Sequence, residues 1–191
     1  MRIESLEQSD AVLVEAAQQG RLDSFGALYQ RYHNPIVALA YAQLGDKHAA
    51  EDAAQEVFAI ACRDLRSLRE RDKFGAWLGG ICRNVTKQML RGKTRTAPLP
   101  GPDATACVPA EEAGEPEQEE RRDAVRRAVW QLPDAERELV VMRYFNGFSQ
   151  ARISQVLDLT PAAVNGRLTR AKRRIAERLE RAGFGSRSWD A

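Results

Sequence analysis

The stretch between Thr160 and Ala182 carries side chains that suit the binding of a polyanion, with seven basic residues against two acidic ones. An α-helix fits the major groove of DNA, and arginines on its exposed face can reach phosphates and base edges together. The residues before this stretch predict a short helix capped by Ser149, a tight turn at Asp158 and a second helix begun by Pro161. This order is typical of a helix-turn-helix, so we expect DNA binding. An ordinary solvated basic helix is the alternative.

Residues along this basic helix divide by position into two groups. The start of a recognition helix points at base edges, whereas its cap and its later turns face phosphates. We therefore expect base contacts from Ala162, Ala163, Asn165, Gly166 and Arg167, with Arg170 behind them. Phosphate contacts are expected from Thr160, Arg173 and Arg174. One helix is thus predicted both to recognise the bases of a DNA duplex and to bind its phosphates.

A polar face in the first half of the chain carries acids one helical turn apart. It would suit a basic or amide-rich partner surface, and it consists of Glu51, Asp52, Gln55 and Glu56. A catalytic site is not expected here, because no histidine, metal-ligand set or glycine-rich phosphate loop accompanies these carboxylates. Taken by itself, the pattern is explained more simply by a solvated face.

The composition sets the class of protein. Charged residues make up 29% of the 191 residues and hydrophobic residues 43%, which excludes a wholly disordered chain and a membrane bundle. The sequence has no run of about 18 apolar residues, and its opening residues lack a basic start followed by an apolar run, so we expect a cytoplasmic protein without direct membrane insertion. The three cysteines are far apart, and the histidines are His33 and His48 alone. Neither a disulfide framework nor a metal site is expected.

The net charge of +2 is the sum of strongly unequal blocks. Five basic residues and no acid lie between Arg83 and Arg95. The following segment, Thr96 to Glu120, has seven acids and no Lys or Arg. Together with the basic stretch from Thr160 to Ala182, this gives two basic patches on either side of an acidic segment. The pattern suggests that the protein binds a polyanion at two places.

Apolar spacing predicts four helices in the first half of the chain, over residues 10–18, 25–44, 47–65 and 74–89. Asp23 and Asp46 are the expected caps of the second and third helices, and Gly45 is the expected end of the second. Trp77 shares an apolar stripe with Phe74, so we expect it to pack in the core. The result is a compact four-helix unit.

The second half begins with a segment too rich in Pro, Gly and acid to fold on its own. Helices are then predicted from residue 125 to Pro133, over residues 139–145 and 150–157, and from Pro161 to residue 179. No alternation of period two occurs, so no strand is expected. The prediction is an all-α protein with two small helical domains: residues 1–95, an acidic flexible linker at 96–122, residues 123–184, and a tail at 185–191.

Three ordered motifs resemble those of the bacterial extracytoplasmic-function (group IV) sigma factors. They are LGDKHAAEDAAQEVF at 44–58, FGAWLGGICRN at 74–84 and LPDAERELVVMRYFNGFSQARISQVLDLTPAAVNGRLTRAKRRIAERL at 132–179. The resemblance covers nearly the whole chain apart from the linker, the first residues and the tail. It implies sigma region 2, a variable linker and sigma region 4, a division that agrees with the charge blocks and helical periods.

The resemblance also implies a role for each surface. The residues that match the surface docking on the β′ clamp helices of RNA polymerase are Asp52, Gln55 and Glu56. The loop 65–73 matches the part that captures the melted minus-10 strand, together with a helix carrying Asn84, Lys87, Gln88 and Arg91. The helix-turn-helix would read the minus-35 element. The implied partners are the polymerase core, including its β flap, promoter DNA and an anti-sigma factor. No cofactor, small-molecule substrate or enzymatic activity is implied.

The sequence departs from the family pattern at two places. Asn165-Gly166-Arg167 stands where many members have Lys-Ser-Arg, so their minus-35 preference does not carry over. Gly79-Gly80 interrupts a predicted helix, and we expect it to allow close packing of a neighbouring helix.

The sequence leaves three questions open. The acidic segment is either a solvated tether or a mimic of nucleic acid. A free-standing helix-turn-helix regulator with a helical sensor domain is the main alternative function. A nucleic-acid enzyme or RNA-binding adaptor is disfavoured, because no catalytic constellation exists.

Overall fold

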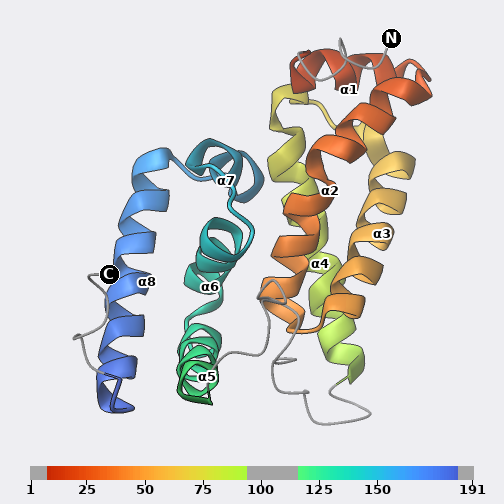
Figure 1. Ribbon diagram of the computed structural model, residues 1–191. Helices are drawn as coiled ribbons and strands as arrows, with labels where there is room; N and C mark the ends of the chain where they lie inside the picture. Colours follow the sequence, from red (N-terminus) through yellow and green to blue (C-terminus); the bar gives the residue numbers. More distant parts are fainter. Residues whose placement is uncertain (1–7, 94–115, 185–191) are drawn as a thin grey trace.

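The computed structural model describes residues 8–93 and 116–184, and within these two ranges every regular element is helical (Figure 1). The expected all-α fold is confirmed. The first range, here called the N-terminal module, contains α1 (Asp10–Gln18), α2 (Leu22–Leu44), α3 (Lys47–Asp64), the short turns η2 (Leu65–Ser67) and η3 (Arg71–Lys73), and α4 (Phe74–Lys93). The second, the C-terminal module, contains α5 (Pro116–Trp130), α6 (Asp134–Val140), η4 (Val141–Phe145), α7 (Gln150–Leu157) and α8 (Pro161–Arg181).

The ends of α2 and α3 follow from local chemistry. Gly45 ends α2 in the left-handed conformation at φ 69°, and the Asp46 carboxylate accepts a hydrogen bond from the Ala49 amide at 2.8 Å. The expectation for Asp23 was wrong, because α2 begins one residue before it. The chain turns tightly at Gly20, with φ 93°, and Arg21 occupies the capping position without a side-chain hydrogen bond. Asp23 instead lies in the first turn, where its charge favours the helix dipole.

The core of the N-terminal module forms where the predicted apolar stripes meet. On α3 the buried residues are Ala50, Ala53, Ala54, Val57, Phe58 and Ala61. Trp77 is partly buried against this core, with its ring 5.9 Å from that of Phe74, which confirms its packing role. The helical spacing of apolar residues puts Tyr29 on the buried stripe of α2, but Tyr29 is 38% exposed because it lies over Phe58 at the edge of the helix pair.

Helix α5 begins at Pro116, inside the segment expected to be linker. Its first turns are polar and are stabilised by ion pairs rather than by apolar packing. Arg126 lies 3.8 Å from Glu119 and 2.7 Å from Asp123, and Arg122 lies 3.9 Å from Glu119. Composition alone therefore extended the linker too far, because it took no account of charges three and seven residues apart. The tail and the rest of the acidic segment lie outside the described residues.

The helix predicted over residues 139–145 is divided in two. After α6 the backbone widens into a π-turn, in which the Asn146 amide bonds to the Val141 carbonyl at 3.2 Å. Gly147 then reverses the chain at φ 68°. This turn delivers the chain to Ser149, where α7 begins.

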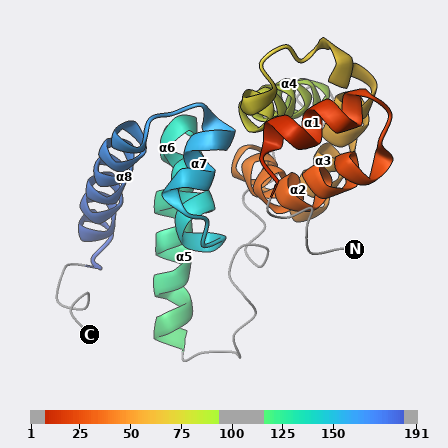
Figure 2. The same ribbon diagram turned by 90° about the horizontal axis from the view of Figure 1, so that it is seen from above.

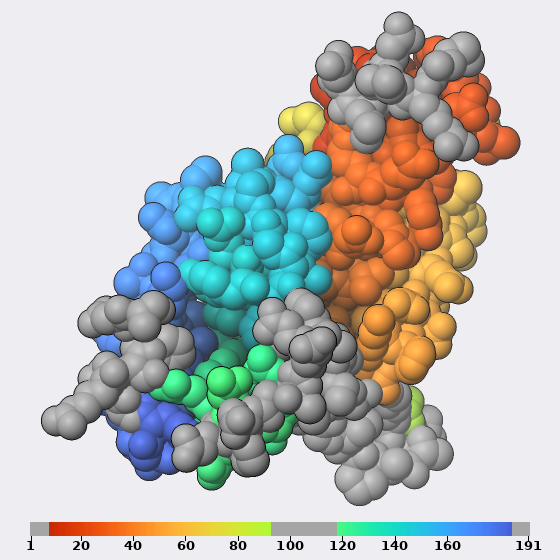
Figure 3. Space-filling model, viewed as in Figure 1, coloured from red at the N-terminus to blue at the C-terminus, as the bar shows by residue number. Residues whose placement is uncertain are grey.

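The two modules pack against each other, and residues from both contribute to one continuous hydrophobic core. Helix α7 lies on α4, and α6 and η4 lie on α2 (Figures 1 and 2). Figure 3 shows the orange surface of α2 meeting the blue-green surface of the C-terminal module. A Cβ atom added at Gly79 would lie 2.3 Å from the Val156 carbonyl oxygen, which confirms that Gly79 permits close packing. Gly80 has open space around it, so the same expectation was wrong there.

Candidate polymerase and nucleic-acid interfaces

The acidic face of α3 is fully available on the surface. Asp52, Gln55 and Glu56 are all exposed, and Ala53 and Ala54 on the opposite side of the helix are buried. Helix α3 lies on the side of the N-terminal module away from the C-terminal module in both ribbon views (Figures 1 and 2). Among the described residues, no ion pair neutralises Asp52 or Glu56. Their charge is therefore directed at solvent or at a partner.

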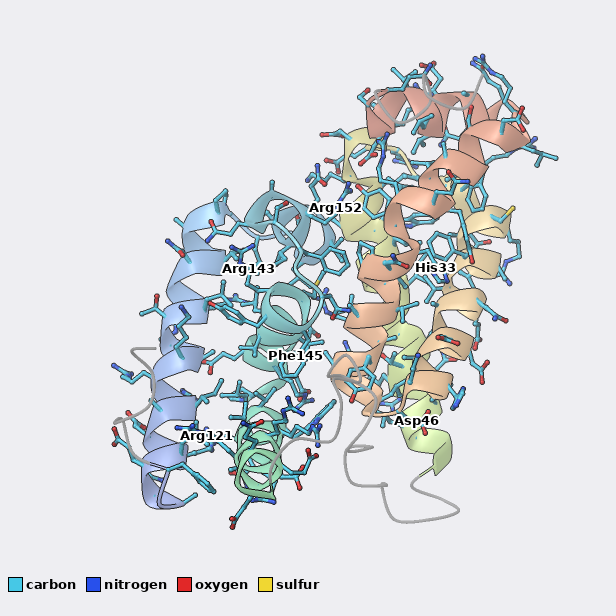
Figure 4. The ribbon with its side chains drawn as sticks, in the orientation of Figure 1. His33, Asp46, Arg121, Arg143, Phe145 and Arg152 are labelled. Carbon is cyan, nitrogen blue, oxygen red and sulfur yellow. The ribbon has the colours of Figure 1, made fainter. Side chains whose placement is uncertain are left out.

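An aromatic group on α2 adjoins this acidic face, and the sequence patterns did not identify it as functional. The Tyr29 ring lies 4.6 Å from that of Phe58 and 5.0 Å from that of His33. Phe58 is one turn beyond Gln55 on α3 and is buried, so the exposed Tyr29 and the half-buried His33 lie over it beside the polar face. His33 projects from α2 in Figure 4. The signal that could have revealed this group is an exposed tyrosine at the edge of an apolar stripe.

The residues expected to meet the minus-10 element share one face of α4. Asn84, Lys87, Gln88 and Arg91 are exposed there. The opposite face carries Cys82, which is fully buried, and burial raises the pKa of its thiol to about 12. That thiol therefore stays neutral and serves packing, as expected of a core cysteine. The exposed face of α4 therefore offers amide and cationic groups on one side of the helix.

The loop before α4 is held in shape by a residue from α1. The Gln18 amide donates hydrogen bonds to the carbonyls of Leu65 at 3.0 Å and Leu68 at 2.9 Å. The Gln18 side-chain oxygen accepts from the Arg71 guanidinium at 3.0 Å, and Arg71 also pairs with Glu15 at 3.1 Å. The loop thus presents its exposed charged residues, such as Arg66 and Arg69, from a fixed backbone. Sequence patterns did not single out Gln18, because its partners are backbone carbonyls distant in sequence.

The helix-turn-helix has the capped geometry that the sequence predicts. The Ser149 hydroxyl accepts a hydrogen bond from the Arg152 amide at 3.2 Å, and the Thr160 hydroxyl accepts from the Ala163 amide at 3.2 Å. Between the two helices, Asp158 takes the left-handed conformation at φ 54°. The Leu159 amide then bonds to the Ser154 carbonyl at 3.1 Å and closes the turn. These bonds fix the angle at which α8 leaves α7.

The predicted minus-35 residues are gathered along α8. Those exposed are Thr160, Ala162, Asn165, Gly166, Arg170 and Arg173, and those half-buried are Ala163, Arg167 and Arg174. The Asn165 side-chain oxygen accepts a hydrogen bond from the Gln150 amide at 3.1 Å, so α7 orients it. Gly166 faces open space, and an added Cβ would meet nothing within 4 Å. The start of α8 therefore presents a shallow surface flanked by Asn165 and Arg167.

Arg174 has a partner inside the C-terminal module. Its guanidinium lies 3.5 Å from Glu136, whose side chain is only 11% exposed. Arg173 is exposed and only loosely paired with Glu177, at 3.8 Å. Of the two arginines expected to contact phosphate, Arg173 is thus the more accessible, and Arg174 also balances a buried charge.

Two candidate features are absent from the part of the chain that the structure describes. None of its helices combines the length and the apolar character needed to cross a lipid bilayer. Among the same residues, no three His, Cys, Asp or Glu side chains are grouped as metal ligands.

The chain matches two sigma-factor families in order along its length. Residues 28–96 match Sigma-70 region 2, and residues 122–175 match Sigma-70 region 4. Over 184 residues the chain is 31% identical to the ECF RNA polymerase sigma-E factor of Escherichia coli K12, which covers 90% of this chain and 95% of that protein. It is also 31% identical over 172 residues to the probable RNA polymerase sigma factor RfaY of Xanthomonas campestris pv. campestris. That match covers 85% of this chain but only 42% of the longer RfaY protein.

Solved structures show the same fold at lower identity. CnrH in complex with the cytosolic domain of CnrY superposes with a TM-score of 0.59 at 23% identity, covering 91% of this chain and 99% of that one. The sigma factor RpoE in complex with the anti-sigma factor NepR, from Bartonella quintana, gives 0.56 at 19% identity, covering 82% and 96%. Because the sequence identity to sigma-E extends over nearly the whole of both proteins, the chain belongs to the extracytoplasmic-function sigma factors, which are transcription initiation factors of RNA polymerase.

Proposed function

We propose that this sigma factor binds the polymerase core through the acidic face of α3 and directs it to a subset of promoters. The observation that carries the proposal is the exposure of Asp52, Gln55 and Glu56 on a helix whose other side is buried core. Carboxylates left unneutralised on a rigid helix suit a basic protein surface such as the β′ clamp helices. Tyr29 and His33 extend this contact with aromatic area, which adds binding energy at protein interfaces.

Promoter contacts are divided between the modules. The α4 face of Asn84, Lys87, Gln88 and Arg91 captures the melted minus-10 strand through amide and cationic groups. The start of α8 reads the minus-35 duplex through Asn165, Arg167 and Arg170, while Thr160 and Arg173 hold phosphates. The protein acts by binding in the cytoplasm and does not act as an enzyme.

Further protein partners follow from the family. The C-terminal module contacts the β flap of the core, and an anti-sigma factor holds the free protein. Support for the second partner comes from CnrH and the Bartonella RpoE, whose solved structures contain the cytosolic domain of CnrY and the anti-sigma factor NepR.

The proposal is tested with purified full-length protein. We expect it to be retained by immobilised core polymerase and to support run-off transcription from promoters recovered by sequencing DNA bound with the polymerase in cells. A free-standing regulator would instead bind promoter duplex tightly without polymerase and would leave core-dependent transcription unchanged. Absence of core binding would overturn the proposal.

A further inference from the structure

Among the described residues, a buried carboxylate at the seam between the modules has polar partners only in the opposite module. Glu138 belongs to α6, and its side chain is 6% exposed. It receives a hydrogen bond from the Gln43 amide at 2.8 Å and an ion pair from Arg83 at 3.0 Å. Gln43 and Arg83 belong to α2 and α4 of the N-terminal module. The folding of α6 itself does not explain why an acid is buried here.

The contacts around Glu138 hold the modules in one closed arrangement. Arg137, next in sequence, donates a hydrogen bond to the Ala42 carbonyl of α2. The Tyr41 and Trp130 rings meet edge to face at 5.6 Å. At the other end of the seam the Arg152 guanidinium, seen between the modules in Figure 4, lies 4.9 Å from the centre of the Tyr32 ring.

Arg83 begins a line of basic residues on α4. Arg83, Lys87 and Arg91 are spaced four residues apart, so they follow one another along the same side of the helix. Lys87 and Arg91 are exposed in the α4 face proposed to capture the minus-10 strand. The Arg83 side chain is 40% exposed, but its guanidinium is turned to the carboxylate of Glu138. A carboxylate and a DNA phosphate bind guanidinium in the same bidentate manner.

We propose that Arg83 is a further nucleic-acid-binding residue of the minus-10 face, and that Glu138 occupies it in the closed form in place of a DNA phosphate. Closure of the modules and capture of the melted strand then compete for one guanidinium. This inference rests on the proposed function, because it assigns Arg83 to the same α4 surface.

The dimensions of a promoter support the competition. Positions minus 10 and minus 35 are separated by about 25 base pairs, or roughly 85 Å of duplex. A packed body of this chain length spans only roughly 40 Å, so the closed form cannot reach both elements. The modules must therefore separate on the promoter, and separation frees Arg83 while it exposes Glu138 to water.

The test uses Glu138→Gln, which keeps the shape of the side chain and removes its charge. Opening is followed by energy transfer between fluorophores on the two modules, and binding by the affinity for a fluorescein-labelled, random-sequence single-stranded DNA of about 20 nucleotides. We expect Glu138→Gln to be more open and to bind the oligonucleotide about fivefold more tightly at 0.1 M salt. The slope of log affinity against log salt concentration should steepen by about 0.7, because one added phosphate contact changes it by that amount.

A second variant distinguishes the release of the Arg83 guanidinium from the separation of the modules. Adding Arg83→Gln to Glu138→Gln should leave the protein open and abolish both the gain in affinity and the change in slope. If the double variant keeps the gain, Arg83 does not contact DNA. If Glu138→Gln neither opens the protein nor tightens binding, Glu138 does not compete with DNA. Either result overturns the proposal.

Matched controls distinguish failure of this inference from failure of the proposed function. Glu136→Gln removes a buried acid from the same helix whose ionic partner, Arg174, lies within the C-terminal module, so it should not open the protein. Glu120→Gln changes the net charge equally at an exposed position of α5 and should not alter DNA affinity. Core retention and run-off transcription are measured on the same proteins. Failure of the wild type in those two assays would count against the proposed function, whereas the oligonucleotide results decide the role of Arg83.

Discussion

Single residues on α8 differ in how much freedom the fold leaves them. Arg174 lies 3.5 Å from the buried carboxylate of Glu136, and Asn165 is oriented by Gln150 from the neighbouring helix. Arg170 is exposed on the same helix. The sequence predicted Arg174, Asn165 and Arg170 alike as DNA contacts from their spacing. Spacing shows which residues share a helix face, but it does not show which partners those residues have in the folded protein. Their roles on DNA remain predictions of the resemblance and the geometry.

Replacement of Arg167 by Ala should change the base preferred at one minus-35 position. Arg167 lies in the second turn of α8, where a side chain reaches base edges, and each lost base contact costs about 1–3 kcal/mol. The measurement is transcription from a promoter library varied at the minus-35 element. Arg173→Ala is the control, since loss of a phosphate contact should weaken all promoters alike. A uniform loss with Arg167→Ala would move Arg167 to the phosphate-binding group.

Cys82 should resist thiol reagents that modify Cys62. Cys82 is fully buried and its pKa is raised to about 12, first by burial and then by the nearby charge of Glu138, so almost no thiolate exists at neutral pH. Cys62 is exposed. In a Cys107→Ser background, we expect one thiol to react rapidly at pH 8 and the second only after denaturant is added. Rapid modification of both thiols in the native protein would show that Cys82 is not buried.

At the scale of helices, capping residues were predicted more reliably than helix lengths. Asp46, Ser149 and Thr160 each accept the expected amide hydrogen bond, because a cap depends on three or four consecutive residues. The start of α5 and the π-turn after α6 were missed. Both depend on interactions that composition does not encode, namely ion pairs along α5 and the packing of η4 on α2.

The adjacent glycines of α4 provide a matched pair of variants. Gly79→Ala should push α7 away, since the new Cβ would lie 2.3 Å from the Val156 carbonyl oxygen, and the seam should loosen. Gly80→Ala meets nothing within 4 Å and should stabilise α4 by up to about 1 kcal/mol through helix propensity. Urea unfolding and small-angle scattering measure the two effects. Equal stabilisation by both variants, with unchanged dimensions, would show that α7 does not rest on Gly79.

At the scale of the whole molecule, the sequence predicted two modules but not their packing. The periodicity of each helix reports that a face is buried and says nothing of whether its own module or the other one covers it. Gly79 indicated a close neighbouring helix, but not that this neighbour, α7, belongs to the other module. The resulting closed body leaves the acidic face of α3 on its outer side, so the proposed docking of the polymerase on this face does not require the modules to separate first.

Charge reversal of that face should therefore abolish docking without unfolding the protein. Asp52→Lys combined with Glu56→Lys places like charges against a basic partner surface, while both positions are exposed and have no ion pair among the described residues. We expect loss of retention on immobilised core polymerase, with the melting temperature and helical content close to wild type. Glu120→Lys with Glu180→Lys makes the same change of net charge on the C-terminal module and should retain docking, since docking depends on where the charge lies. A double reversal on α3 that still binds the core with wild-type affinity would show that the polymerase uses another surface, and loss of the fold would show that these acids are structural.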